Sequence, residues 1–111
     1  MAEPPSPDRR LDLRVSGSAR GVVVAPDMEV ACLIVDVSGG GLRVRLDRQL
    51  ALPRRVIVVD VAQATAHDVE VIWQKTPEAG MKRISQSGLR GLTPSRLTAA
   101  RSAWLRAGGR P

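Results

Sequence analysis

Short runs of β-branched and apolar residues, separated by turn-forming residues, recur along most of this 111-residue chain. The run 41–46 is the clearest, because Leu42, Val44 and Leu46 alternate with two arginines. An alternation with a period of two residues predicts a strand with one buried face. Six strands are expected, at residues 17–25, 29–37, 41–46, 54–61, 66–74 and 79–84. Repeated short strands of this kind indicate an antiparallel β-sandwich or β-barrel.

The last part of the chain follows a helical pattern instead. Thr93 and Pro94 predict a helix start, with Thr93 as the N-cap and proline at the first helical position. Residues at helical spacing follow: Leu97, Ala100, Arg101, Trp104 and Leu105. Gly108 and Gly109 are expected to end this helix. In a barrel fold, we expect Trp104 to anchor the helix on the barrel mouth.

Length and charge restrict the possible functions only broadly. A chain of 111 residues is long enough for one domain with a core. The formal net charge is +6, and all basic residues except Lys75 and Lys82 are arginines. This excess favours an anionic partner such as a nucleotide, a nucleic acid or an acidic protein surface. The arginine-rich codon usage of a GC-rich genome explains the same excess equally well.

The residue types used in catalysis and metal binding are scarce. His67 is the only histidine, and Cys32 is the only cysteine and lies in an apolar run, where we expect it to be buried. Asp68 follows His67, but neighbouring strand residues point to opposite faces. No catalytic triad, zinc cluster or carboxylate pair can be assembled from these residues. We therefore expect a protein that is not an enzyme and needs no metal or cofactor.

The sequence also favours a cytoplasmic location. No apolar stretch approaches the ~20 residues of a membrane span, and the polar residues 1–10 do not resemble a signal peptide. A single cysteine cannot form an internal disulfide, which fits a reducing compartment. Residues 1–8 are rich in proline and polar side chains, so we expect them to be disordered.

A cluster of arginines follows this start: Arg9, Arg10 and Arg14. A guanidinium group is planar and permanently charged, and its donors match phosphate oxygens or the O6/N7 edge of guanine. Several arginines can therefore hold a ligand that contains both guanines and phosphates. We expect these three on a mobile arm.

A second polar motif is the turn DVSGGG at residues 36–41, in which Asp36, Ser38 and Gly41 are spaced as D-x-S-x-x-G. The aspartate can accept hydrogen bonds from the Watson–Crick edge of guanine, or it can orient an arginine. The serine adds a small hydroxyl group, and the glycines let a flat base or a phosphate approach the backbone closely. This chemistry is suited to binding rather than catalysis.

An arginine pair four residues apart, then a strand, then D-x-S-x-x-G opening another strand resembles the PilZ domain, a family of bacterial receptors for cyclic dimeric guanosine monophosphate (cyclic di-GMP). The resemblance implies a six-stranded antiparallel β-barrel over residues 9–84, with residues 85–111 as a linker and a C-terminal helix that packs on the barrel. The ligand-binding residues that it implies are Arg9, Arg10, Arg14, Asp36, Ser38 and Gly41. One departure is the absence of the aromatic residue that is common near the end of the last strand, where this chain has Met81, Arg83 and Ile84.

The resemblance implies a stand-alone receptor or adaptor that changes conformation on binding cyclic di-GMP. It would regulate an unidentified downstream protein in motility, exopolysaccharide production or virulence. Two alternatives are a small basic β-barrel that binds nucleic acid and a protein–protein adaptor that responds weakly to nucleotide. Nucleic acid is disfavoured because the chain has no Tyr or Phe, whereas single-strand binders usually stack bases on aromatic side chains.

Four side chains have two interpretations each. The strand pattern points Trp73 inward, which favours a core role over a stacking surface for guanine. Arg20, Arg43 and Arg45 either line the rim of a ligand site or face water, and we favour water.

Overall fold

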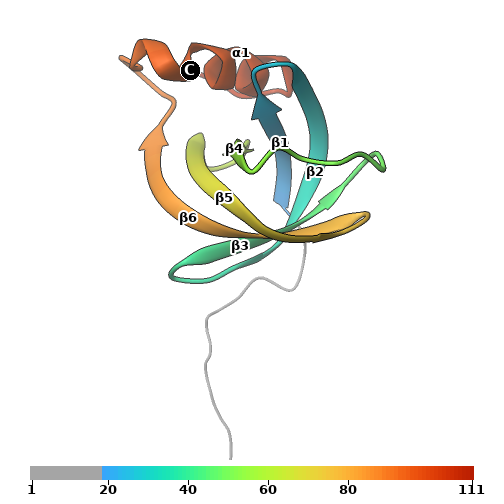
Figure 1. Cartoon of the computed structure of the whole chain (residues 1–111). Helices are drawn as coiled ribbons and strands as arrows, with labels where there is room; N and C mark the ends of the chain where they lie inside the picture. Colours follow the sequence, from blue (N-terminus) through green and yellow to red (C-terminus); the bar gives the residue numbers. More distant parts are fainter. Residues whose placement is uncertain (1–18) are drawn as a thin grey trace, which may run out of the picture.

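The computed structural model describes residues 19–111, so the predictions for Arg9, Arg10, Arg14 and the segment 1–8 lie outside it. Six antiparallel strands close into a barrel in the order β1-β2-β3-β6-β5-β4, and one helix lies against its wall (Figure 1). The strands are β1 (Ala19–Ala25), β2 (Met28–Val37), β3 (Gly41–Leu46), β4 (Arg55–Asp60), β5 (Thr65–Lys75) and β6 (Glu78–Gly88). The predicted six-stranded barrel with a C-terminal helix is confirmed.

The barrel interior is filled by the apolar side chains of the alternating strand pattern. Val23, Val44, Val58 and Val69 are fully buried there, each on a different strand. The predicted burial of Cys32 is confirmed, and burial raises the pKa of its thiol to about 12, with a further contribution from two nearby carboxylates. The thiol is therefore protonated, and a poor nucleophile, at neutral pH.

The C-terminal helix begins later than the sequence predicts. Pro94 has an extended ψ of 148°, and a short 3-10 turn, η1 (Ser95–Leu97), precedes α1 (Thr98–Arg106). The hydroxyl of Thr93 donates to the carbonyl oxygen of Gly91 and caps neither element. The predicted N-cap is thus wrong. The predicted end is confirmed, because α1 stops before Gly108, whose φ of 106° suits glycine.

The helix packs on the outer face of β1 and β4 rather than on the barrel mouth. Val22 and Val24 of β1 point away from the interior and, with Val59 of β4, contact the apolar face of α1. Trp104 anchors this layer as predicted, because it is fully buried and its Nε1 donates to the carbonyl oxygen of Val61 at 3.0 Å. The prediction placed the helix wrongly because β1 is apolar on both faces, so alternation could not identify its outer side.

The hairpin of β5 and β6 is longer than predicted and irregular. β6 continues to Gly88, beyond the expected end at residue 84, because backbone pairing with β5 extends through polar residues. A register shift between Val71 and Trp73 inserts one residue into β5. This bulge breaks the alternation, so Ile72 and Trp73 are both exposed, at 60% and 44%. The predicted core role of Trp73 is therefore wrong.

No helix among residues 19–111 is both long and apolar enough to cross a bilayer.

Candidate ligand-binding site

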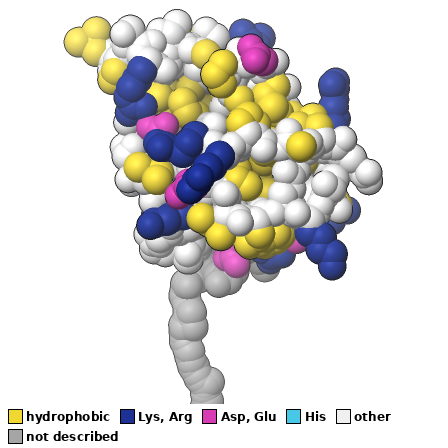
Figure 2. Space-filling model, in the orientation of Figure 1, with side chains coloured by type: hydrophobic (Ala, Val, Ile, Leu, Met, Phe, Trp, Pro, Cys, Tyr) yellow, Lys and Arg dark blue, Asp and Glu magenta, His cyan; other side chains and the backbone are white. Residues whose placement is uncertain are grey.

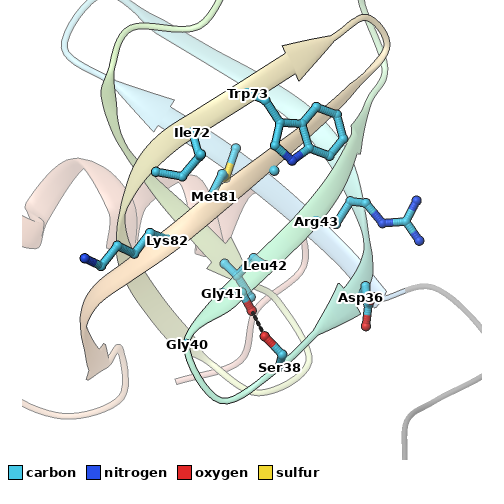
Figure 3. Close-up of a pocket in the computed structure, with 11 residues that line it drawn as sticks. Asp36, Ser38, Gly40, Gly41, Leu42, Arg43, Ile72, Trp73, Met81 and Lys82 are labelled. Atoms are coloured by element: carbon cyan, nitrogen blue, oxygen red, sulfur yellow. Dashed lines mark hydrogen bonds between the residues drawn. The ribbon is translucent and has the colours of Figure 1, made fainter.

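The DVSGGG turn joins β2 to β3 and brings its three predicted site residues together. The turn is closed by the backbone N–H of Ser38, which donates to the carbonyl oxygen of Gly41 at 2.9 Å. A register shift in β2 after Ile34 places Asp36 opposite Arg43 of β3. Asp36, Ser38 and Gly41 all line one open pocket of about 390 Å³ (Figure 3). The structure therefore assembles the described half of the sequence-predicted site.

This pocket lies on the outer surface of β3, β5 and β6. Its remaining lining residues are Gly40, Leu42, Arg43, Ile72, Trp73, Gly80, Met81 and Lys82. Its volume lies within the range of about 300–1,000 Å³ that is usual for small-molecule sites.

Gly80 permits the indole of Trp73 to form one wall of the pocket. The two residues are paired across β5 and β6, and a Cβ atom at Gly80 would lie 2.1 Å from the indole Nε1. The ring therefore covers the backbone of β6, leaving one side toward the pocket (Figure 3). Gly41 is required for a different reason, since a Cβ atom there would lie 2.7 Å from the carbonyl oxygen of Met81.

Two cations stand at the margin of the pocket. Arg43 donates to Glu78 at 3.1 Å and remains 43% exposed, whereas Lys82 lies on β6 at the other side (Figure 3). Arg43 thus lies at the pocket margin and is also partly exposed to water, so the preference for a water-facing role stays a prediction. Arg45 is 57% exposed beside Glu78, and Arg20 donates to the carbonyl oxygen of Ala107 at 2.8 Å.

Basic side chains on the face seen in Figure 2 are dispersed around a central area of hydrophobic side chains. They do not form one continuous stripe on that face.

Arg83 ties the turn to β6. Its Nη1 donates to the carbonyl oxygen of Gly39 at 2.8 Å and its Nη2 to that of Ser38 at 3.3 Å. Its backbone N–H donates to the carbonyl oxygen of Gly40 at 2.9 Å. The Nε of Arg83 donates to Nδ1 of His67, which is 7% exposed. Burial, and then the charge of Arg83, lower the pKa of His67, while Asp60 acts in the opposite direction.

A family model described as the PilZ domain matches residues 8–96, which is most of the chain. The protein belongs to the PilZ domain family. PilZ domains are receptors for cyclic di-GMP and act by binding rather than by catalysis. The matched range contains Arg9, Arg10 and Arg14 as well as the whole DVSGGG turn, and it ends within η1. Comparison with curated proteins and with solved structures gave no match.

The sequence pattern of this PilZ domain favoured a core role for Trp73 over a stacking surface, and it did not indicate Lys82 or Arg83 as part of the site. The bulge at Ile72 concealed Trp73, although the glycine opposite it was a usable indication that the ring needed space. Arg83 was recognised only as a departure from the family pattern. Its contacts depend on how the turn folds back on β6, which no periodicity encodes.

Between residues 19 and 111, no group of three or more His, Cys, Asp or Glu side chains is placed to hold a metal ion.

Proposed function

We propose that this PilZ protein is a receptor for cyclic di-GMP, which binds in the pocket beside the DVSGGG turn. The observation that carries the proposal is that Asp36, Ser38 and Gly41 line one pocket in a chain that also has the complete arginine motif. The pocket has cationic margins at Arg43 and Lys82, which suit a ligand with two phosphates.

In this proposal, Arg10 and Arg14 hold phosphates and guanine edges through their guanidinium groups. Arg9 is either a third contact or a source of local positive potential. Asp36 accepts hydrogen bonds from a guanine, and Ser38 adds its hydroxyl group. Gly41 lets the ligand approach the backbone.

Trp73 adds a stacking surface for one guanine. Its indole is 44% exposed and stands at the pocket edge, and stacking of a base on an aromatic ring contributes about 1–3 kcal/mol. The indole of Trp73 would contact the face of a guanine, while the DVSGGG turn would form hydrogen bonds with its edge.

Binding would bring the segment with Arg9, Arg10 and Arg14 onto the barrel beside the turn. The surface offered to a downstream protein would then differ between the free and bound states. The protein would thus act as a cytoplasmic receptor or adaptor without catalytic activity, cofactor or metal.

Isothermal titration calorimetry with cyclic di-GMP tests the proposal. We expect saturable binding, with weaker binding of GTP, of the linear dinucleotide and of a short oligonucleotide. Arg14→Ala and Asp36→Ala should each weaken the affinity by about one to two decades, because each removes charge-assisted hydrogen bonds. The control is Arg48→Ala, an exposed arginine at the opposite end of β3 from the turn. A wild-type protein that binds the oligonucleotide and not cyclic di-GMP would overturn the proposal.

A further inference from the structure

We propose that Arg83 is a positioning residue that holds the DVSGGG turn in its binding shape, and that His67 keeps the Arg83 guanidinium in place as a hydrogen-bond acceptor. The inference rests on the proposed function, since it concerns the shape of the same pocket. It adds two residues that do not contact the ligand in that proposal.

The side chain of Arg83 reaches the turn from the side opposite the pocket. Ala79 and Met81 are buried in the barrel core, and Arg83 continues their alternation on β6. Gly80 and Lys82, on the outer face of the same strand, line the pocket, whereas Arg83 does not. Arg83 can therefore act on a bound nucleotide through the turn rather than by direct contact.

Besides the contacts with Arg83, a side-chain hydrogen bond within the turn runs from the hydroxyl of Ser38 to the carbonyl oxygen of Gly41, at 3.5 Å. A Cβ atom at Gly39 or Gly40 would meet nothing within 4 Å, so no described side chain packs against these two residues in the direction of a Cβ. Glycine also has the widest backbone freedom of all residues. The guanidinium group of Arg83 donates to the carbonyl oxygens of Ser38 and Gly39, which belong to consecutive peptide groups. These two hydrogen bonds restrict the backbone conformation of a segment whose glycines would otherwise leave it flexible.

The hydrogen bond between Arg83 and His67 exists only while the histidine is neutral. Nδ1 of His67 accepts from Nε of Arg83 at 3.3 Å, and a protonated imidazole has no acceptor atom. Protonation of His67 would place an N–H at Nδ1 facing the N–H at Nε of Arg83. It would also put a second positive charge beside the guanidinium group. Of the charged groups that act on His67, Arg83 on β6 disfavours the protonated form and Asp60 on β4 favours it.

The affinity for cyclic di-GMP should consequently depend on pH. With its pKa lowered below the usual value of 6.5, His67 is neutral at pH 7 and becomes protonated only in more acidic solution. We expect constant affinity at and above neutral pH, and weaker affinity once the solution is acidic enough to protonate His67. Simple attraction between a new positive charge and the ligand phosphates would give the opposite trend.

Calorimetry with cyclic di-GMP on the full chain tests these roles, at temperatures where each variant is folded by circular dichroism. Arg83→Ala should weaken the affinity by about tenfold or more. Arg83→Lys keeps the charge without the planar fork and should restore it only in part. His67→Gln retains an acceptor and should keep the neutral-pH affinity but lose the pH dependence. Arg48→Ala, which removes the same charge elsewhere, should match the wild type.

Amide hydrogen exchange on the free proteins gives a readout that needs no ligand. The amide of Ser38 donates to Gly41 within the turn, and the amide of Arg83 donates to Gly40 of the turn. Arg83→Ala should therefore accelerate amide exchange at residue 38 more than in β1 or β4. Unchanged exchange there overturns the positioning role, whether or not the wild type binds cyclic di-GMP. The positioning role is also overturned if Arg83→Ala binds cyclic di-GMP as tightly as the wild type. The same holds if the affinity of the wild type rises in acidic solution. Failure of the wild type to bind, with turn exchange accelerated as expected, refutes the proposed function alone.

Discussion

The two tryptophans of this PilZ protein lie against two parts of the barrel and have opposite environments. Trp104 is fully buried between α1 and the outer face of β1 and β4, and its Nε1 is bonded to a backbone carbonyl. Trp73 is 44% exposed on β5 beside the DVSGGG turn. Each ring covers a glycine, since a Cβ atom at Gly109 would lie 2.2 Å from Trp104 and one at Gly80 would lie 2.1 Å from Trp73.

The difference shows that two parts of the barrel surface have different roles. On the helix side, apolar side chains point outward and are covered, so the surface contributes to stability. On the turn side, the bulge in β5 turns an aromatic ring outward among glycines and charged residues, and nothing in the described part of the chain covers it. An exposed indole ring offers a flat surface on which a base can stack. Helix-side substitutions should therefore change folding, and turn-side substitutions should change binding.

The largest effect should come from Trp104→Ala. Removing this buried ring should lower the free energy of unfolding by about 3–5 kcal/mol, because the transfer energy of the indole is lost and a cavity remains. Chemical denaturation monitored by circular dichroism measures the loss. Affinity for cyclic di-GMP, measured on the folded fraction, should change little. A comparable loss of affinity would show that the two sides of the barrel are not independent.

Trp73→Ala should give the reverse pattern. We expect weaker cyclic di-GMP affinity by about tenfold, from the loss of a stacking surface, and a change in unfolding free energy below about 1 kcal/mol. Calorimetry and denaturation of the same sample separate the two effects. Strong destabilisation without a change in affinity would assign Trp73 to the structure after all.

Substitution of the glycine beneath each tryptophan ring, Gly109 or Gly80, should have smaller effects that can be compared directly. Gly109→Ala should lower the unfolding free energy by about 1–3 kcal/mol, because the buried Trp104 ring has no free space to enter. Gly80→Ala should cost less stability, since the Trp73 ring can move into solvent, but it should weaken binding. Thermal melts and titrations of both variants test this, and equal melting temperatures would contradict the contrast.

The smallest effect concerns pH and stability. Because folding lowers the pKa of His67, the unfolded chain takes up a proton first as the solution is acidified. The free energy of unfolding should therefore fall as the pH drops from about 6.5 toward the lowered pKa of His67, and this fall begins above the range where most carboxylates titrate. Denaturation of the wild type and of His67→Gln across this range isolates the contribution. A variant that retains the full pH dependence would exclude His67 as its source.

The sequence predicted the parts of this molecule that follow a simple period. Alternation in residues 41–46 and the glycines after α1 identified a strand and a helix end, and the D-x-S-x-x-G spacing predicted residues that do share a pocket. Prediction from the sequence failed where the local structure depends on tertiary packing. The bulge at Ile72, the 3-10 turn before α1 and the reach of Arg83 to the turn depend on long-range pairing that no local pattern records.

Amide hydrogen exchange of the full chain with and without cyclic di-GMP tests the central claim most directly, because it locates the ligand on the barrel. We predict slower exchange on binding at residues 8–16, in the turn at 36–41 and around 80–82. The helix and the strands beneath it should be unchanged. Protection on the helix side, or no added protection in the turn, would contradict the assignment of the pocket as the cyclic di-GMP site.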